Sequence, residues 1–346
     1  MESILYDKRI ELSKDVPEHG QFKVMEGIPQ FNYTETVSTD NSPEVAPESI
    51  KVAVFNMEHG YRFTDIVDFM KECPDMQNLD ILFGNELDDG TLRSGNVNTS
   101  EKIAQLLDSS YAYGLEFIEL VDSRDEKGYE GNAVFSRWPI VYTESLHQPI
   151  TYDWYYDRQK RIGARVAIFA EIDIKGQHIG TVCVHLENRT DGEGRAKQMK
   201  AVLDRAKELW PDIPVVIGGD CNTNTFDGND KDAFTKYFNE LENGAKARDV
   251  EDYEPLLNMC EEYGYNYKDF NGNHLITRRK PMVVIEKDLP LHLDWIFAKG
   301  LVCTGHGCVS TAVEDFSWAK PDSNLKKLDY KQLSDHNAVW ATCKLK

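Results

Sequence analysis

The feature that most restricts the fold of this chain is a series of short apolar segments, most of which end in polar residues. Segments of this length, rich in β-branched residues and bounded by turn formers, are typical of buried strands. Several follow one another without a helical segment between them, whereas every crossover of a doubly wound parallel sheet needs a helix. We therefore expect an α/β fold in which two mixed β-sheets pack face to face, with helices outside. The segments are KVAVFNM (51–57), DILFGNE (80–86), AVFSRWPIVY (133–142), RVAIFAEIDI (165–174), IGTVCVHLE (179–187), PVVIGGDCNTN (214–224), LDWIFAKG (293–300) and NAVWATCKL (337–345).

Helices are predicted where apolar residues recur every three or four positions. Residues 65–73 and the segment EKIAQLLDSS (101–110) have this spacing. The longest such stretch runs from Arg195 to Trp210, and Pro211 closes it. These few helices are enough to cover the outer faces of two sheets.

The first 49 residues differ in composition from the rest. Residues 34–49 are rich in Ser, Thr, Pro, Asp and Glu, with almost nothing to bury, which is typical of a linker or a surface strap. We expect an N-terminal extension and linker over residues 1–49 and a single domain over residues 50–346. The extension has apolar residues through which it could pack on that domain, namely Phe22, Val24, Met25, Ile28 and Phe31.

The charge of the chain restricts its partners. The sequence has 59 acidic and 39 basic residues, a formal charge of −20 and a pI near 4.9. Proteins that bind long nucleic acids nonspecifically usually present a basic surface, because neutralisation of phosphates dominates that affinity. The charge argues against that mode, but it is compatible with a small phosphate ester, a strand end or local basic residues in one cleft.

The sequence shows no sign of membrane insertion or export. No apolar run approaches the roughly 20 residues that cross a bilayer, and residues 1–8 are charged, without the apolar core of a signal peptide. The seven cysteines are scattered and form no CxxC pair, which favours reduced, mostly buried thiols. If the numbering starts at the natural start, we expect a cytoplasmic protein. The sequence carries no signal for an oligomeric state.

Polar residues at the strand ends are the candidates for function. Taken singly, each of them could be a capping residue or a turn former. Their recurrence favours a site, because ligand and catalytic sites of sheet proteins gather at the ends of strands. The residues are Asn56, Glu86, His185, Asp220 with Asn222, Asp294, and Asp335 with His336 just before the last strand.

The segment GGDCNTN is the most informative of these strand ends. If the strand continues through it, alternation places Asp220 and Asn222 on one side and Cys221 on the other. The paired glycines before Asp220 allow a close approach of the backbone. A carboxylate beside a carboxamide suits activation of a water and a hydrogen bond to a phosphoryl oxygen, whereas Cys221 is expected to be buried and structural.

Taken in order, these segments resemble a known superfamily. NMEHG, GNELD, GNAVFSRWPI, VHLEN, GGDCNTN, LDWIF and SDH are similar to the motifs of the endonuclease/exonuclease/phosphatase superfamily, over residues 51–346. That superfamily includes pancreatic-type deoxyribonucleases, abasic-site endonucleases, inositol-phosphate phosphatases, neutral sphingomyelinases and tyrosyl-DNA phosphodiesterases. The resemblance implies a DNase I-like fold, a four-layer α-β-β-α sandwich, and hydrolysis of phosphoester bonds.

The resemblance also implies a metal site. Glu86 matches the principal metal ligand of the superfamily, Asn56 assists it, and Asp335 matches a residue near the metal. Hard cations such as Mg²⁺ or Mn²⁺ prefer oxygen ligands and keep several waters, so few protein ligands suffice. Glu58 lies two residues after Asn56, hence on the same face of the expected strand, at a position where some members have Asp. It is either a group that supports the metal ligands or a solvated carboxylate. His59 is interpreted as a surface or packing histidine.

The remaining matches imply catalytic roles. Asp220 matches the residue that orients or deprotonates the attacking water, and Asn222 the residue that holds the phosphate. His336 matches the imidazole that contacts the scissile phosphate, with Asp294 as its carboxylate partner. His185 is similar to the second phosphate-contacting histidine of deoxyribonucleases and sphingomyelinases.

Further residues are candidates for supporting the site or contacting substrate. Arg195 and Gln198 match an R-x-x-Q pattern that is expected to support His185 and its loop. Asn132 is a candidate to reach the cleft. In TYDWYYDRQKR, the aromatic and basic residues either form a stacking surface beside the site or pack onto the core, and both readings stay open. The candidates for substrate contact in this segment are Trp154, Tyr155 and Arg158.

The leading hypothesis is a metal-dependent phosphodiesterase of the nuclease type, which works by in-line attack of an activated water on a phosphate ester such as a nucleic-acid end. The alternative is a phospholipid-headgroup or inositol-phosphate phosphoesterase, although no stretch with bare aromatics or leucines at a turn indicates membrane docking. A binding module without catalysis is the third hypothesis. It is disfavoured because a competent residue type fills each of the matched positions.

Overall fold

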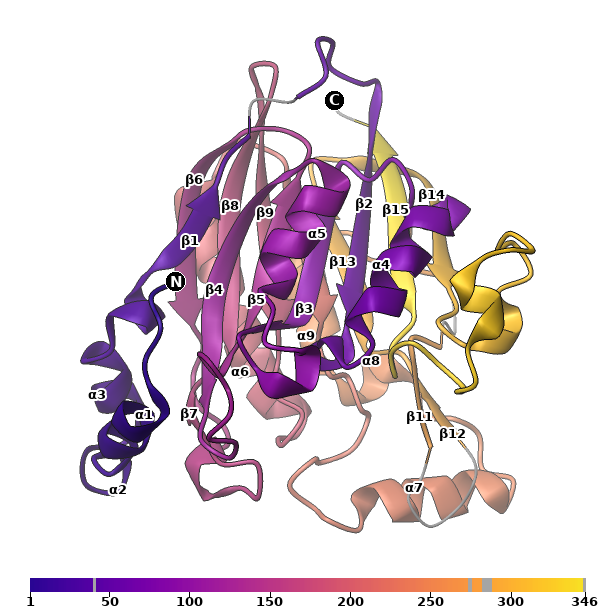
Figure 1. Cartoon of the computed structure of the whole chain (residues 1–346). Coiled ribbons are helices and arrows are strands. Elements are labelled where there is room, and N and C mark those ends of the chain that lie inside the picture. The colour runs from indigo at the N-terminus through magenta and orange to yellow at the C-terminus, as the bar shows by residue number, and fades with distance from the viewer. Residues whose placement is uncertain (40–41, 273–275, 282–287, 345–346) are drawn as a thin grey trace.

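The chain folds around two β-sheets that lie face to face between outer helices (Figure 1). The computed structural model describes residues 1–39, 42–272, 276–281 and 288–344. Both sheets are mixed: most neighbouring strands are antiparallel, and each sheet contains one parallel pair. The prediction of two mixed sheets packed face to face is therefore confirmed.

The larger sheet has eight strands and contains the parallel pair β2–β3. The short strand β7 (Arg161–Gly163) pairs with β4 beside the main path. In spatial order, the other strands are β1 (Thr34–Val37), β4 (Ser110–Glu119), β5 (Tyr129–Ser136), β3 (Ile81–Asp89), β2 (Ser49–Asn56), β15 (Ala338–Lys344) and β14 (Val302–Val309).

The smaller sheet has five strands and contains the parallel pair β9–β10. A separate two-stranded hairpin is formed by β11 (Arg278–Pro281) and β12 (Asp288–Leu291). The strands of the smaller sheet are, in spatial order, β13 (Asp294–Lys299), β10 (Val215–Asp220), β9 (Gln177–His185), β8 (Val166–Ile174) and β6 (Ile140–His147).

The segment AVFSRWPIVY forms two strands rather than the single one predicted. β5 ends at Ser136 in the larger sheet and β6 begins at Ile140 in the smaller one, so the turn between them carries the chain from one sheet to the other. Pro139, which cannot donate to a strand ladder, lies in the turn between the two strands. Arg137 pairs with Asp80 in this turn, at 3.7 Å between Nη1 and Oδ1.

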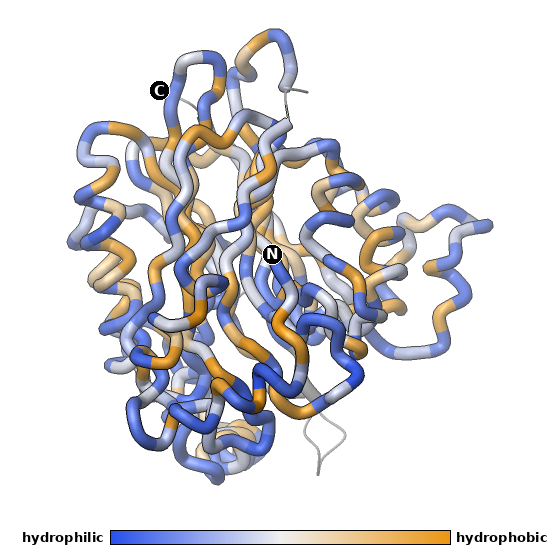
Figure 2. Tube along the Cα trace, turned by 60° about the vertical axis from the view of Figure 1, so that its left-hand side comes forward, coloured by the Kyte–Doolittle hydropathy of each residue, from blue (hydrophilic) through white to orange (hydrophobic). Residues whose placement is uncertain are grey.

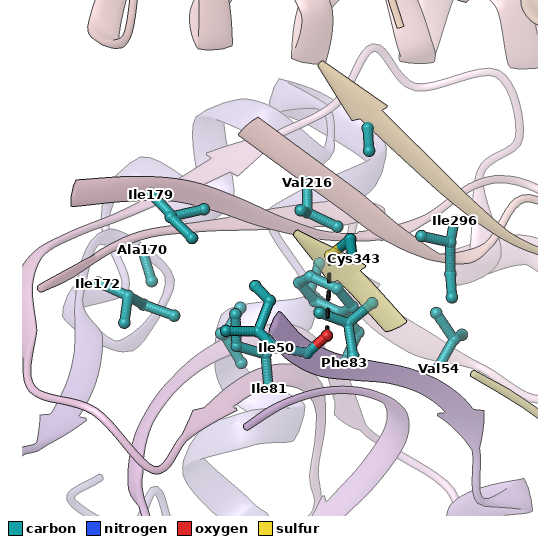
Figure 3. Packing of buried hydrophobic residues seen from close by; sticks show 14 of the residues in the cluster. Ile50, Val54, Ile81, Phe83, Ala170, Ile172, Ile179, Val216, Ile296 and Cys343 are labelled. Atoms are coloured by element: carbon teal, nitrogen blue, oxygen red, sulfur yellow. Dashed lines mark hydrogen bonds between the residues drawn. The ribbon is translucent and has the colours of Figure 1, made fainter. Parts of the chain in front are cut away.

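Hydrophobic side chains fill the space between the sheets (Figure 3). Ile50, Val54, Ile81 and Phe83 of the larger sheet meet residues of the smaller sheet such as Val216, and all are buried. Burial of apolar area, worth about 25 cal/mol per Å², makes this layer a source of stability. In Figure 2 hydrophobic residues recur along the strands, whereas the outer loops are mostly hydrophilic.

Two further apolar layers attach helices to the outer faces. α4 (Phe63–Glu72) and α5 (Thr99–Leu107) pack on the larger sheet through residues such as Phe69 and Ile103. α6 (Gly192–Leu209) and α9 (Pro255–Glu262) pack on the smaller sheet through residues such as Met199 and Leu257. The order is helix, sheet, sheet, helix, which confirms the predicted four-layer sandwich.

The N-terminal residues pack on one edge of the larger sheet. α1 (Tyr6–Ser13), α2 (Val16–His19) and α3 (Gln21–Glu26) precede β1, which pairs with β4. Of the apolar residues expected to pack, Val24, Met25, Ile28 and Phe31 are buried, but Phe22 is 45% exposed. Residues 34–37 form an edge strand rather than a linker, because main-chain pairing with β4 needs few apolar side chains. The domain boundary at residue 49 stays a prediction.

The remaining described helices, α7 (Ala233–Glu242) and α8 (Val250–Tyr253), lie between β10 and α9 in the sequence. Within the described ranges, no helix combines the length and the apolar character that crossing a membrane requires. Five cysteines are buried and two are partly buried, in agreement with the expectation of mostly buried thiols.

Candidate active site

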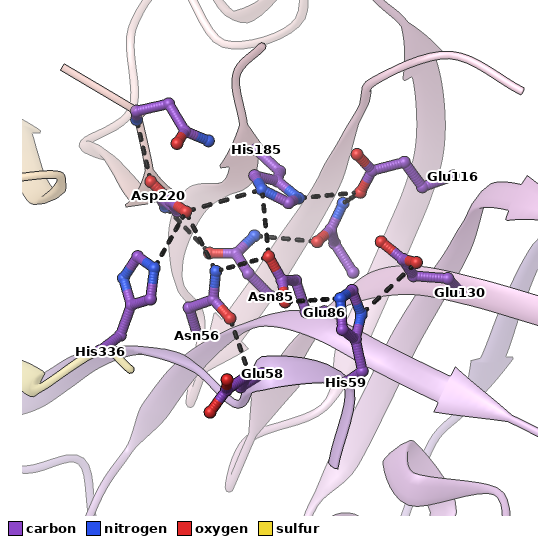
Figure 4. A network of polar contacts seen from close by, with 12 residues as sticks. Asn56, Glu58, His59, Asn85, Glu86, Glu116, Glu130, His185, Asp220 and His336 are labelled. Carbon is purple, nitrogen blue, oxygen red and sulfur yellow. Dashed lines mark hydrogen bonds and ion pairs between the residues drawn. The ribbon is translucent and has the colours of Figure 1, made fainter. Parts of the chain in front are cut away.

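Five of the predicted functional residues point toward one another between the two sheets (Figure 4), namely Asn56, Glu86, His185, Asp220 and His336. Across the smaller sheet, the register places Asp220 beside His185 on one side and beside Asp294 on the other. In the larger sheet Asn56 pairs with Asn85, next to Glu86. Parallel pairing brings the carboxyl ends of β2 and β3, and of β9 and β10, to the same edge, so residues distant in sequence share one centre.

Asp220 lies at the middle of this centre. Its Oδ2 accepts a hydrogen bond from Nδ2 of Asn56 at 3.0 Å, which links the two sheets. The Nε2 atoms of two histidines face the same oxygen, that of His185 at 3.6 Å and that of His336 at 3.7 Å. The Asp220 side chain is almost completely buried, and an amide and two imidazoles surround its carboxylate.

The glycine before Asp220 is required by close packing. Gly219 has φ +151°, and a Cβ there would lie 1.9 Å from the carbonyl oxygen of Val184. The expected close approach of the backbone is therefore confirmed. Cys221 is fully buried among the residues under α6, as expected.

The strand alternation predicted for Asn222 is wrong. β10 ends at Asp220, and Asn222 has φ +48°, so it follows a turn rather than the strand. Its backbone N–H nevertheless donates to Oδ1 of Asp220 at 2.9 Å, and its Nδ2 donates to the carbonyl of Leu186 at 2.9 Å. The turn keeps Asn222 beside Asp220 and ties it to the loop after His185.

His336 is held by a buried carboxylate. Its Nδ1 lies 2.8 Å from Oδ2 of Asp294, and its backbone N–H donates to Oγ of Ser334. Burial alone would lower the pKa of His336, but the carboxylates of Asp294 and Asp220 raise it to about 10. The partner on Nδ1 orients the ring so that Nε2 points to the centre.

Glu86 projects into the centre from an irregular part of β3. The register with β5 shifts between Gly84 and Leu87, and Glu86 has φ +54°. Its Oε1 accepts from Nδ2 of Asn56 at 3.1 Å. Burial would raise the pKa of Glu86, but His59 and His185 outweigh it and lower the pKa to about 2.

Asp335 and Glu58 lie beside each other at the edge of the centre. The backbone N–H of Asp335 donates to Oε2 of Glu58 at 3.1 Å, and Nη2 of Arg278 donates to Oδ2 of Asp335 at 3.1 Å. Glu58 is not on the face of β2 as the strand-end match assumed: β2 ends at Asn56, and Glu58 has φ +46° in a 3₁₀ turn.

Behind His185 lies a buried charge network. Its Nδ1 is 3.0 Å from Oε2 of Glu116, and Nη1 of Arg165 is 3.0 Å from both ring nitrogens. Arg165 also pairs with Glu116 at 2.6 Å and with Glu187 at 3.2 Å. Burial and Arg165 act to lower the pKa of His185, but Glu116 and Asp220 prevail and raise it.

Sequence reasoning missed Glu116 and Arg165. Two signals were available: Glu116 lies inside the apolar segment YGLEFIE (113–119), and Arg165 stands at the start of a buried strand. Ionised groups are rarely buried unless they are paired, so both residues could have been expected to have charged partners.

Asn132 does not lie where a substrate contact was expected. It is fully buried, its Oδ1 accepts from Nδ2 of Asn85 at 2.9 Å, and its Nδ2 donates to Glu116 at 2.6 Å. Asn85 in turn accepts from the backbone N–H of Asp220 at 2.9 Å. Asn132 therefore links the buried partners of His185 and Asp220.

Arg195 and Gln198 of α6 contact the loop that follows His185. Nε and Nη2 of Arg195 bind Glu254 at 2.9 and 2.6 Å, and its Nη1 donates to the carbonyl of Thr190 at 2.9 Å. Oε1 of Gln198 accepts from the backbone N–H of Glu187 at 2.8 Å.

The aromatic segment around Trp154 packs on the core. Trp154 is 4% exposed and its Nε1 donates to Oε2 of Glu187 at 2.9 Å. Tyr155 is 9% exposed, with Nζ of Lys160 3.9 Å from its ring centre. Arg158 is exposed. The packing interpretation therefore holds for Trp154 and Tyr155.

The donor set of this centre fits a hard divalent cation. The ligand atoms of Glu86, His185 and Asp220 lie within 4.8 Å of one another, and so do those of Asp220, Asp294 and His336. Oδ1 of Asp335 lies 3.9 Å from Nε2 of His336, which places a further carboxylate near this group. Carboxylate and carboxamide oxygens are the ligands that Mg²⁺ and Mn²⁺ prefer, and concentrated negative charge favours a cation there.

The chain is a layered α/β protein, an α-β-β-α sandwich that gathers carboxylates, carboxamides and two imidazoles at its strand ends. The chain belongs to the Endonuclease/Exonuclease/phosphatase family, whose model matches residues 53–336. At the level of that family, it is a metal-dependent hydrolase of phosphoester bonds. A comparison with curated proteins gave no sequence match.

Solved structures share the fold at low sequence identity. The human Nocturnin catalytic domain with bound sulfate anion is 15% identical, with a TM-score of 0.55, over 92% of this chain and 98% of that one. An endonuclease/exonuclease/phosphatase from Beutenbergia cavernae is 16% identical, with a TM-score of 0.54, over 86% and 72%. D. rerio TDP2 complexed with single strand DNA product is 14% identical, with a TM-score of 0.50, over 86% and 100%.

Proposed function

We propose that this chain is a Mg²⁺- or Mn²⁺-dependent phosphodiesterase in which Asp220 activates the attacking water. The observation that carries this proposal is the placement of Asp220 Oδ2 between Nε2 of His185, at 3.6 Å, and Nε2 of His336, at 3.7 Å. A carboxylate flanked by two imidazoles can accept a proton from water while the imidazoles contact the phosphate that the water attacks.

Each residue of the centre takes one part of this reaction. Asp220 orients the water for in-line attack, and Asn222 binds a phosphoryl oxygen. His336 and His185 donate hydrogen bonds to the other phosphoryl oxygens, which gain charge in the transition state. Asp294 and Glu116 keep the two rings oriented through Nδ1.

Glu86, Asn56 and Asp335 are the residues that would hold the cation. When bound, the cation neutralises the phosphoryl oxygens and the leaving oxyanion. Arg278, which pairs with Asp335, keeps that carboxylate in place. The ligand atoms of Glu86, His185 and Asp220 lie within 4.8 Å of one another, so the residues that would hold the cation adjoin those that would contact the phosphate.

For the substrate, we propose a nucleic-acid end rather than a long duplex. The charge of −20 disfavours extended contacts with a polyanion, because such binding depends on the neutralisation of many phosphates. A strand end needs only one or two phosphates in the centre. D. rerio TDP2, which shares the fold, has been solved with a single strand DNA product, and this supports the same class of substrate here.

Hydrolysis of bis(p-nitrophenyl) phosphate tests the chemistry. We expect activity that EDTA abolishes and added Mg²⁺ or Mn²⁺ restores, and that is lost in Asp220→Ala and His336→Ala. Asp212→Ala, in an exposed turn, and His178→Ala, at the far end of β9, are matched controls that should retain activity. Activity that survives EDTA would refute the metal mechanism, and full activity of both site variants would refute the site.

A substrate screen tests the class of ester. Single-stranded ends, abasic duplex, sphingomyelin, inositol phosphates and mononucleotides would be compared by kcat/KM under the same conditions. The proposal expects the highest value for single-stranded ends. A higher value for sphingomyelin or inositol phosphates would favour the phospholipid-headgroup or inositol-phosphate alternative.

A further inference from the structure

His59 lies between two carboxylates at the edge of the centre (Figure 4). Its Nε2 is 3.3 Å from Oε2 of Glu86, and its Nδ1 is 3.4 Å from Oε2 of Glu130. The histidine side chain is 15% exposed, and the two carboxylates come from neighbouring strands of the larger sheet. One side of the ring thus faces a candidate metal ligand, and the other faces a buried acid.

Glu130 is fixed in position by two arginines. Its Oε2 accepts from Nη1 of Arg161 at 2.7 Å and from Nη2 of Arg93 at 2.9 Å, and its side chain is 1% exposed. Arg93 also binds both carboxylate oxygens of Asp88, at 2.7 and 2.8 Å. Charge-assisted pairs of this kind are strong and geometrically specific, so Glu130 is fixed in place, with its Oε2 3.4 Å from Nδ1 of His59, an ion-pair distance without a hydrogen bond.

The backbone on both sides of the contact is strained. His59 has φ +57° and ψ 11°, and Glu86 has φ +54°; this left-handed region is uncommon for residues other than glycine, although asparagine, aspartate and histidine adopt it more often than glutamate does. The turn that carries His59 is tied to β3 by the bond from the N–H of Met57 to the carbonyl of Asn85, at 3.1 Å. Such strain persists only where the surrounding structure enforces it, and it clusters at functional sites.

Glu86 keeps the capacity to bind a cation in this arrangement. Asn56 donates to its Oε1 and His59 faces its Oε2, but a carboxylate offers about four lone pairs. Each oxygen therefore retains a lone pair for a metal after its contact with the protein. The hydrogen bond from Asn56 restricts rotation of the carboxylate about its last torsion, and the ring of His59, with its Nε2 3.3 Å from Oε2, limits that rotation from the other side.

We infer that His59 is a positioning residue that holds Glu86 in the orientation required by a divalent cation, with Glu130 and its arginines as the anchor. This inference rests on the proposed metal site and deepens it. Groups behind metal ligands orient them, and their removal typically costs about 10- to 100-fold in metal affinity. If His59 had only a packing role, through its edge contact with the ring of Tyr61 at 5.7 Å between centroids, its removal would lower stability without this loss of metal affinity.

The test is direct measurement of Mn²⁺ binding to the full chain, with the signal of free Mn²⁺ in electron paramagnetic resonance as the readout. The variant is His59→Asn, because asparagine tolerates the left-handed backbone of this position but is too short to bridge Glu86 and Glu130. We expect Mn²⁺ to bind this variant about 10- to 100-fold more weakly than the wild type. We expect kcat at saturating Mn²⁺ to stay close to that of the wild type.

Two further variants keep the test specific. His59→Gln retains a side-chain donor of greater reach, and we expect it to recover part of the affinity. His178→Asn is the matched control, because Nδ1 of His178 lies 2.6 Å from Oε1 of Glu171 at the opposite end of β9. It removes a histidine–glutamate pair outside the site and should leave Mn²⁺ binding unchanged. Thermal melting of each variant shows whether it is folded.

The outcomes separate this inference from the proposed function. Wild-type affinity for Mn²⁺ in a folded His59→Asn variant would overturn the positioning role. Unchanged affinity together with a large fall in kcat would overturn it as well, since His59 would then act on the substrate. Absence of Mn²⁺ binding by the wild type would instead refute the proposed metal site itself.

Discussion

Nδ1 of His336 lies 2.8 Å from Oδ2 of Asp294, and both side chains are buried. The two residues are 42 positions apart in the sequence. They meet because the start of β13 and the end of the loop before β15 lie at the same edge of the sandwich. Oδ1 of Asp294 has no hydrogen-bond partner in the described part of the chain. Oδ2 of Asp294 thus meets Nδ1 of the imidazole, whose Nε2 points toward Asp220.

The first prediction concerns this pair. Asp294→Asn preserves volume but removes the charge that favours the imidazolium and orients the ring. We expect kcat for bis(p-nitrophenyl) phosphate to fall by about 10²- to 10⁴-fold, the usual worth of a positioned acid–base group, with little change in fold by circular dichroism. Activity close to that of the wild type would show that His336 does not need its buried partner.

The second prediction concerns metal binding and stability. A ligand that binds only the folded state at 100 times its Kd stabilises it by about 2.7 kcal/mol. We expect saturating Mg²⁺ to raise the Tm of the wild type, and to raise that of Glu86→Gln much less, as measured by differential scanning calorimetry. Glu101→Gln, at an exposed position of α5, is the control and should respond as the wild type does. An equal rise in all three proteins would contradict the role of Glu86.

The third prediction distinguishes two roles for Arg195 of α6, namely structural support of the loop after His185 and binding of substrate. Arg195 and Glu254 are both fully buried and form a double hydrogen bond. Arg195→Met leaves Glu254 as an uncompensated buried charge, and breaking a buried pair in this way costs about 3–5 kcal/mol. We expect this loss in urea unfolding and a KM close to the wild-type value. A large rise in KM with normal stability would assign Arg195 to the substrate instead.

The fourth prediction concerns pH. Burial would raise the pKa of Glu187, but Arg165 and the hydrogen bonds to its carboxylate lower it below the ordinary value. The pKa of a glutamate in the unfolded chain is about 4.3. At a pH between the two pKa values, the unfolded state therefore binds more protons than the folded state. The stability contributed by Glu187 is present above the unfolded pKa and is lost as the pH falls through the folded pKa.

The measurement is the difference in free energy of unfolding between the wild type and Glu187→Gln. We expect the free energy of unfolding of the wild type to exceed that of the variant most at about pH 6, and the difference to shrink toward about pH 3. A difference that is constant across this range would show that the ionisation of Glu187 does not contribute to stability.

Much of the fold was predictable because hydrophobic patterning is a local signal. The segment KVAVFNM became β2 and the stretch from Arg195 to Trp210 became α6, each within a few residues of the expected bounds. The pattern failed at Arg137 and Pro139, where one apolar segment serves two sheets. It also failed at residues 34–37, because an edge strand is held by main-chain hydrogen bonds that leave no apolar signature.

The candidate site was predictable where its residues end strands. Asn56, Glu86, His185, Asp220 and Asp294 could be proposed from their place in the sequence, since strand ends gather in space. His59 was read as a surface or packing residue, and Glu116, Glu130 and Arg165 were missed. Their roles depend on partners from other strands, and no local pattern identifies those partners.

The sequence by itself determined the layered α/β class and the residue types at the strand ends, because periodic burial and turn chemistry act over a few residues. Only the tertiary structure decided which of these side chains meet. Strand register places Asp220 between His185 and Asp294, and a strained turn places His59 between Glu86 and Glu130. Such pairings depend on packing and main-chain hydrogen bonding across the whole sandwich, and these are non-local.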